Sequence, residues 1–188
     1  MTLSTFIPPA DTLVQQCLDG DRAAYRVLYN RYAKAMYNTA LRIVNHTADA
    51  EDVLQESFSD AFAKLADFEG RSTFGAWLKQ IVVNKSISVL KKQRLSFSDI
   101  GVNVMESIAE ETEVNEDEIN YNVESIKKAV QRLPDGYRTV LLLYLFEGYD
   151  HEEISEILQV AQSTVRTQYI RARQKLLQLL KKEALYEQ

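Results

Sequence analysis

The carboxy-terminal part of the chain carries the side chains best suited to contact a nucleic acid. Between Ser163 and Lys182 the sequence has six Lys or Arg residues and no carboxylate. At a helical turn of 100° per residue, the polar face of this run combines small polar groups, cations and one apolar residue: Ser163, Thr167, Ile170, Arg171 and Gln174, with Arg166 at the flank. Major-groove recognition uses this mixture, and a solvated basic helix in a bundle would show the same pattern.

A second candidate group consists of carboxylates at helical spacing. Asp49, Asp52 and Glu56 follow one another at three- and four-residue steps, with Glu51 and Gln55 beside them. A metal or acid–base site would need the carboxylates to converge with other ligands, and the two histidines of the chain lie in different halves. Docking on a basic protein surface and a solvated face near a helix start both fit the spacing, which leaves the two open.

Aromatic and basic residues alternate downstream of these carboxylates. Phe68 and Trp77 lie near Arg71 and Lys85 in the sequence. Rings that stack on bases and cations that bind phosphates suit a single-stranded nucleic acid. Taken alone, Trp77 fits the core better than a stacking platform. Asn84 is placed either to hydrogen-bond a base edge or to lie on a solvated helix surface.

Charge divides the chain into three blocks. Residues 1–95 have 12 basic and 10 acidic side chains, residues 96–125 have nine acidic and no basic ones, and residues 126–188 have 10 basic and eight acidic ones. The net charge of −5 therefore hides two weakly basic blocks and a strongly acidic connector. Two basic blocks on one tether indicate two contacts with one polyanion.

The elements that position these residues are predicted to be helices. The chain has only six Gly and three Pro residues, which disfavours a turn-rich β fold. Asp21 is expected to cap the second helix and Thr47 the third. Residues 96–125 show no sustained period and are predicted to form an irregular acidic linker. The helices expected in the first block span residues 12–18, 21–44, 47–65 and 72–94.

The last block is also expected to be helical. Its first helix should start near Ile126 and end at Leu133, because Pro134-Asp135-Gly136 combines a helix breaker with a turn. Residues 137–146 have the period of another helix. The sequence therefore predicts an all-α protein with two small helical domains, at residues 1–95 and 126–188. An acidic linker at residues 96–125 joins them.

Two helices joined by a tight turn close the chain and predict a helix-turn-helix. Asp150 and Glu153 form a capping-box pattern at the start of the first helix, which should end at Leu158. A turn over residues 159–162 then leads to the basic helix. Such turns often use Gly where the chain leaves the first helix, so mild strain or an altered turn is expected at Gln159.

Composition limits the remaining classes of protein. The single Cys17 excludes an internal disulfide and fits a reducing compartment. No apolar run approaches the ~20 residues that span a bilayer, and residues 1–10 lack the pattern of a signal peptide. We expect a cytoplasmic protein with no membrane insertion, no cofactor, no metal site and no catalytic residue.

Several motifs, in order and in register, resemble the extracytoplasmic-function sigma factors of the sigma-70 family. The resemblance covers roughly residues 12–92 and 126–180. In the first block the similar runs are YRVLYNRY at 25–32, DAEDVLQESF at 49–58 and GRSTFGAWL at 70–78, followed by Ile81 and Asn84. In the last block they are LPDGYR at 133–138, YDHEEI at 149–154, TVR at 164–166 and RARQKL at 171–176.

This resemblance implies a specificity subunit of bacterial RNA polymerase without catalytic chemistry of its own. In that family a carboxylate-bearing helix docks on a basic coiled coil of core RNA polymerase. The matching residues here, which we call the docking residues, are Asp49, Asp52, Gln55 and Glu56. An anti-sigma factor is a further partner that the resemblance allows.

The resemblance also implies two contacts with promoter DNA. A loop and the helix after it open the −10 element and capture a flipped base, and extruding that base costs least at a weakly stacked step. The residues assigned to this −10 set are Phe68, Arg71, Ser72, Trp77, Asn84 and Lys85. The last helix reads the −35 element as duplex, and the −35 set is Ser163, Thr164, Arg166, Thr167, Ile170 and Arg171. Family members generally have a more basic pair at Thr167-Gln168, which leaves a phosphate contact at Gln168 without support.

The net charge also predicts how the protein binds DNA in the absence of polymerase. An acidic chain should bind DNA weakly alone, because phosphate neutralisation supplies most nonspecific affinity. Core polymerase would align both basic blocks, and the linker would mimic nucleic-acid charge in the polymerase. The rival interpretation is a stand-alone helix-turn-helix regulator, which would bind duplex DNA without polymerase. An enzyme built on Asp49, Asp52 and Glu56 would instead bind a divalent metal.

Overall fold

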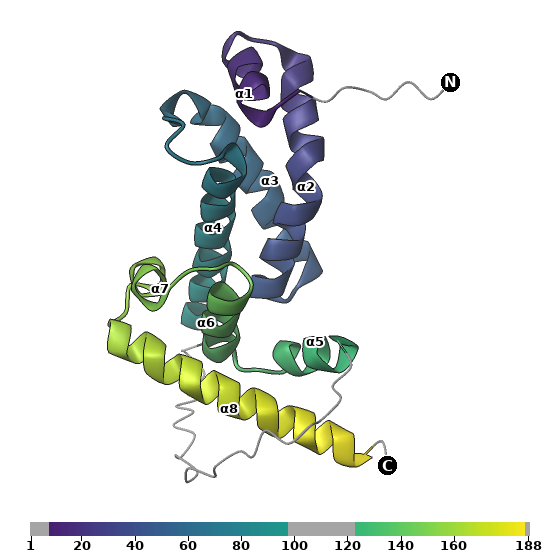
Figure 1. Cartoon of the computed structure of the whole chain (residues 1–188), viewed down its shortest axis with the longest axis vertical. Coiled ribbons are helices and arrows are strands. Elements are labelled where there is room, and N and C mark those ends of the chain that lie inside the picture. The colour runs from purple at the N-terminus through teal and green to yellow at the C-terminus, as the bar shows by residue number, and fades with distance from the viewer. Residues whose placement is uncertain (1–7, 98–122, 187–188) are drawn as a thin grey trace. The chain divides into compact units, whose positions relative to one another are not determined.

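The computed structural model describes residues 8–97 and 123–186. Throughout these residues the secondary structure is helical, with no strand, and the expected all-α fold is confirmed (Figure 1). The chain divides into two compact units between Val89 and Leu90, which is a point inside the helix that spans Phe74–Phe97. Most of the acidic linker expected at 96–125 lies outside the described residues.

The first unit is built on a pair of packed helices, α2 and α3, with α1 packed against α2. Its core is apolar and fully buried, with Leu28, Phe74 and Leu78 inaccessible to solvent. Because the apolar residues of α3 face this core, its charged residues are left on the opposite side, toward solvent, although Ser57 is buried with the apolar ones. The elements are α1 (Ala10–Leu18), α2 (Arg22–Val44), α3 (Thr47–Ala63), the 3-10 turn η1 (Leu65–Asp67) and α4 (Phe74–Phe97).

Side-chain caps set where the helices of the first unit begin. Asp21 caps α2 as predicted, since its carboxylate accepts a hydrogen bond from the amide of Ala23 at 2.8 Å. The cap expected at Thr47 is wrong by one residue. Asn45 ends α2 in the left-handed conformation, with φ 56°, and His46 is then extended. The imidazole of His46 therefore accepts from the amide of Asp49, and Thr47 is already helical.

The second unit places three helices on one long helix, α8. Leu141, Leu142 and Leu143 of α6 are almost fully buried, and so is Ala172 of α8. Burial of this apolar surface is the main stabilising contribution to such a small unit. The elements are α5 (Val123–Gln131), α6 (Asp135–Leu145), α7 (His151–Leu158) and α8 (Gln162–Tyr186).

The corner between α5 and α6 differs from the predicted turn. Pro134 is the residue before α6, and Asp135 and Gly136 form the first helical turn instead of a separate turn. The fixed φ of proline and its missing N–H suit a helix start as well as a helix end. Arg138, only 4% exposed, holds the corner by donating to the carbonyl of Leu133 at 3.0 Å and pairing with Asp135 at 2.6 Å.

The start of α7 follows the capping-box prediction in full. The carboxylate of Asp150 accepts from the amides of Glu152 and Glu153, at 2.8 and 2.9 Å. The carboxylate of Glu153 in turn accepts from the amide of Asp150 at 2.8 Å. Both ends of this exchange satisfy amides that the helix itself leaves without a partner, so the start of α7 is fixed.

The end of α7 carries the strain expected at Gln159. This residue is left-handed, with φ 60° and ψ 46°. Its amide bonds to the carbonyl of Glu156 and the amide of Val160 bonds to that of Ser155, which is the Schellman arrangement that glycine favours. Gln159 therefore keeps a backbone conformation that its own Cβ opposes.

Replacing Gln159 with Gly is expected to stabilise the second unit. Relief of left-handed strain outweighs the entropy of a more flexible unfolded chain, so Gln159→Gly should raise the free energy of unfolding by about 0.5–1 kcal/mol. Urea titration followed by circular dichroism measures the change. Glu156→Gly, inside α7, is the matched control and should lower it by about 1 kcal/mol. An unchanged or lower stability of Gln159→Gly would contradict the assigned strain.

Candidate functional site

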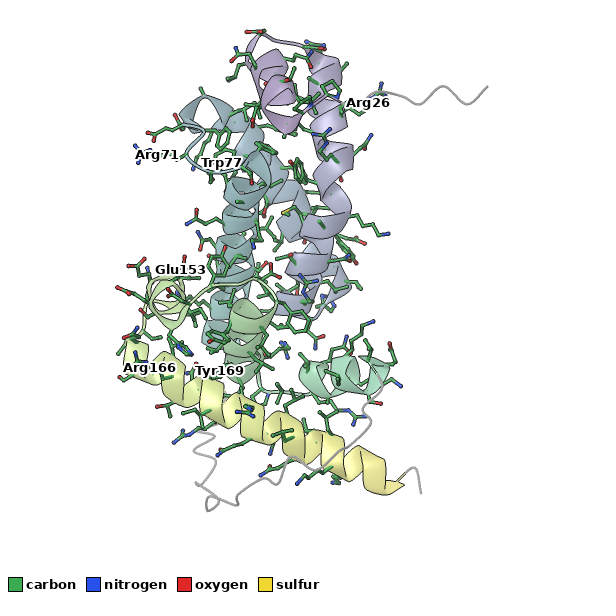
Figure 2. All side chains as sticks on the ribbon, viewed as in Figure 1. Arg26, Arg71, Trp77, Glu153, Arg166 and Tyr169 are labelled. Atoms are coloured by element: carbon green, nitrogen blue, oxygen red, sulfur yellow. The ribbon has the colours of Figure 1, made fainter. Side chains whose placement is uncertain are left out.

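The outward face of α8 presents the predicted −35 set. Val165 and Ala172 anchor the helix because both are fully buried. Ile170 is 55% exposed, which leaves an apolar side chain accessible to a thymine methyl group. Arg166 projects from the amino-terminal part of α8 (Figure 2). All six predicted residues are exposed: Ser163, Thr164, Arg166, Thr167, Ile170 and Arg171.

Two details define the chemistry of this face. The hydroxyl of Thr167 donates its proton to the carbonyl of Ser163 at 2.9 Å, so it offers an incoming base an acceptor oxygen and a methyl group, and it has no proton left for a phosphate. The first turn of α8 has no acidic residue that would repel a phosphate. The positive end of the helix dipole can therefore attract a DNA phosphate without repulsion from a nearby carboxylate of the same turn.

An aromatic group joins α6, α7 and α8 behind the exposed face. The Tyr144 ring stacks on His151 with centroids 4.7 Å apart, and Tyr169 lies 4.7 Å from Tyr144 and 5.5 Å from His151. Figure 2 shows Tyr169 on α8. The sequence places Tyr169 on the inward face of its helix but gives no sign of the contacts with Tyr144 and His151. These contacts fix the rotation of α8 and thus which residues face outward.

The docking residues all lie on α3 and differ in how exposed they are to solvent. Asp52, Gln55 and Glu56 are exposed. Asp49 is only 26% exposed, since it lies against His46 with 3.2 Å between its carboxylate and the imidazole Nδ1. The structure thus brings all four residues onto one helix, with Asp49 drawn into the helix start.

The −10 set separates into an exposed loop and a packed support. Phe68 and Trp77 are half-buried, with ring centroids 5.2 Å apart, and both lie within 6.0 Å of the buried Phe74 ring. Arg71 and Ser72 are exposed on the loop above them, and Arg71 pairs with Glu69. Figure 2 shows Arg71 on this loop and Trp77 on α4. The two aromatic rings hold the loop in place.

The two remaining −10 residues lie side by side on α4 and differ in their surroundings. Asn84 is exposed. Lys85 is 23% exposed and binds two carboxylates of α3, at 3.1 Å from Glu56 and 2.9 Å from Asp60. The sequence assigned no role to Asp60, because only the tertiary packing of α3 and α4 brings it to Lys85.

Hydrogen bonding between Lys85 and Asp60 shifts both side chains toward their charged forms. The pKa of Lys85 is raised chiefly by its hydrogen bond to Asp60, and the pKa of Asp60 is lowered chiefly by the same bond. Desolvation opposes both shifts. The pair therefore stays ionic throughout the neutral range, and it weakens only in strong acid or strong alkali.

Two features of the described residues bear on other functions. No three His, Cys, Asp or Glu side chains in this part of the chain are grouped to hold a metal ion. None of the described helices is both long and apolar enough to cross a membrane.

Comparison with known proteins assigns both units to one family. The family model for Sigma-70 region 2 matches residues 28–95, and that for Sigma-70, region 4 matches residues 123–176. The RNA polymerase sigma-H factor of Pseudomonas aeruginosa is 33% identical over 187 residues, which are 92% of this chain and 95% of the relative. The ECF RNA polymerase sigma-E factor of Salmonella typhimurium is 30% identical over 171 residues, 86% and 89% of the two chains. The chain belongs to the extracytoplasmic-function sigma factors.

A solved sigma factor agrees with the assignment. RpoE of Bartonella quintana, in complex with the anti-sigma factor NepR, matches this sigma factor with a TM-score of 0.56 and 25% identity, over 84% of this chain and 96% of that one. Within this sigma factor, the docking residues and the −10 set fall inside the region 2 match. The −35 set falls inside the region 4 match, together with α7 and the part of α8 up to residue 176.

Proposed function

We propose that this chain directs core RNA polymerase to specific promoters and initiates transcription by recognising the −35 element and melting the −10 element. The observation that carries the proposal is the presence of both sigma regions in one chain, each with its predicted contact residues at or near the surface. The protein itself catalyses no reaction in this scheme. It acts where polymerase acts, in the cytoplasm.

In this proposal the first domain, residues 1–95, docks on polymerase and holds melted DNA. Asp52, Gln55 and Glu56 are exposed on α3 and suit a basic partner surface. Asp49 contributes from the half-buried start of the same helix. Acidic residues on the subunit and basic ones on polymerase would speed the encounter and fix its register.

The −10 element is captured by the loop that precedes α4. Arg71 and Ser72 are exposed there and are placed to contact the displaced strand, and Asn84 follows on α4. Phe68 and Trp77 act mainly as the packed support, because their rings are already in contact with Phe74. The loop is therefore preorganised before a flipped base binds, which reduces the entropic cost of capturing that base.

The −35 element is read by the last domain, residues 126–188. Arg166 and Arg171 provide the charged donors for guanine edges or phosphates, and Ile170 provides the apolar contact. Ser163, Thr164 and Thr167 complete the set with short polar groups. The acidic linker at 96–125 connects this domain to the first and discourages DNA binding by the free protein.

We also propose an anti-sigma factor as a second protein partner. The support is the similar solved chain from Bartonella quintana, which is bound to an anti-sigma factor. Such a partner would keep the protein from core polymerase until a signal releases it.

Run-off transcription tests the proposed function. Purified protein and core polymerase on a promoter library should give transcripts whose −35 and −10 elements define a consensus, and core polymerase alone should give none. Gel shifts without polymerase should show no specific duplex binding. Specific binding by the protein alone, with no transcripts on the library, would favour the stand-alone helix-turn-helix regulator.

A further inference from the structure

Lys85 belongs to the −10 set and forms an ion pair with one of the docking residues, Glu56. Its ammonium, on α4, is 3.1 Å from Oε2 of Glu56 and 2.9 Å from Oδ2 of Asp60, both on α3. Glu56 is one of the docking residues, and its side chain is 68% exposed. The carboxylate of Glu56 is thus exposed to a binding partner, but it already forms an ion pair with Lys85 of the same chain.

We propose that Lys85 competes with core polymerase for Glu56, and that Asp60 holds Lys85 in place once polymerase has taken Glu56. The inference rests on the proposed function, since it requires docking through α3. Lys85 and Asp60 would then be positioning residues that regulate how readily the docking surface is available.

The geometry makes Glu56 the carboxylate that leaves. Glu56 and Asp60 are four residues apart on α3, so they lie on one face of the helix and reach the same ammonium. The contact with Asp60 is the shorter one, and Glu56 is the more exposed carboxylate, at 68% against 47%. If Glu56 turned to a cation of polymerase, Asp60 would still bind Lys85, so no ammonium would be left unpaired.

The same arrangement explains why the two carboxylates are tolerated as neighbours. Like charges four residues apart on a helix repel each other. Lys85 between them removes that repulsion in the free protein. The cost is that Glu56 is less available to polymerase than Asp52, which is exposed and forms no ion pair within the described part of the chain.

Affinity for core polymerase tests this competition. Lys85→Met keeps the apolar stem and removes the ammonium, and it should lower Kd for core polymerase by about twofold to fivefold, the range of one exposed ion pair. Asp60→Asn should raise Kd by about twofold, because Lys85 then depends on Glu56 alone. In a Glu56→Gln background, Lys85→Met should leave Kd unchanged.

The controls separate this inference from the function on which it rests. Lys34→Met, on α2, changes the net charge equally and should not alter Kd. Thermal unfolding confirms that each variant is folded. If Lys85→Met leaves Kd unchanged or raises it while Asp52→Lys abolishes docking, the competition is wrong and the docking assignment stands. A Lys85→Met effect that persists with Glu56→Gln also overturns it. If Asp52→Lys binds core polymerase normally, both the docking assignment and the competition are wrong.

Discussion

Reversing the charge of Asp52 should abolish most of the affinity for core polymerase. Asp52 is exposed on α3 between the other docking residues, and no ion pair ties it to the described residues. Asp52→Lys would place a cation against a basic surface, and like charges at an interface cost several kcal/mol. We expect a loss of about 3 kcal/mol, or about a 100-fold rise in Kd.

Fluorescence anisotropy of labelled protein titrated with core polymerase measures this loss. The matched control is Asp19→Lys, which makes the same charge reversal in the same unit. Asp19 is exposed at the carboxyl end of α1, where a cation is favourable to the helix, so the fold should tolerate it. Asp52→Lys with the affinity of the unaltered protein would show that α3 is not the docking helix.

Salt dependence gives the prediction a second readout. An interface steered by opposite charges loses on-rate as ionic strength rises, because salt screens the attraction. Asp52→Lys should therefore show a flatter dependence of the association rate on salt than the unaltered protein. A loss of affinity caused by local unfolding would not flatten that dependence, and circular dichroism would detect it.

Helix faces were predictable from the sequence because they depend on local periodicity. Val165 and Ala172 are expected to face inward from their spacing alone, and both are fully buried. The outward residues Thr167, Ile170 and Arg171 follow from the same period and are exposed. The strained turn at Gln159 was also accessible, since glycine is the residue that the turn favours and it is missing.

Features that depend on tertiary contacts were not accessible from the sequence. Lys85 and Asp60 are 25 residues apart, and only the packing of α3 and α4 joins them. Trp77 packs on Phe74, in line with the expectation that it fits the core better than a stacking platform, but the sequence did not indicate that Phe68 also packs there. Aromatic rings with apolar neighbours in reach gain more from burial than from exposure.

Local errors have an equally local cause. His46 and Thr47 are both able to accept an amide hydrogen bond, so the choice of cap depended on which backbone became extended. Because Asn45 takes the left-handed conformation, α2 ends there and the next residue, His46, is extended and becomes the cap. At Pro134, the same residue type ends one helix and begins another, and the pattern alone did not tell the two roles apart.

Removing the guanidinium of Arg171 should weaken sequence discrimination at the −35 element. Arg171 is exposed on the outward face of α8, next to Ile170 and one turn from Thr167. An arginine that binds a guanine edge contributes about 1–3 kcal/mol of discrimination against the wrong base. Arg171→Ala should reduce the preference for the best −35 sequence over a single-base variant by about tenfold.

The measurement is the ratio of holoenzyme affinities for the two promoters, taken at one fixed salt concentration. Lys182→Ala is the matched control, because Lys182 is an exposed cation on the same helix about three turns away. It should lower both affinities together and leave the ratio unchanged, as the loss of a phosphate contact does. If Arg171→Ala behaves like Lys182→Ala, Arg171 contacts the DNA backbone, and the bases of the −35 element are read by Arg166 and its neighbours at the start of α8.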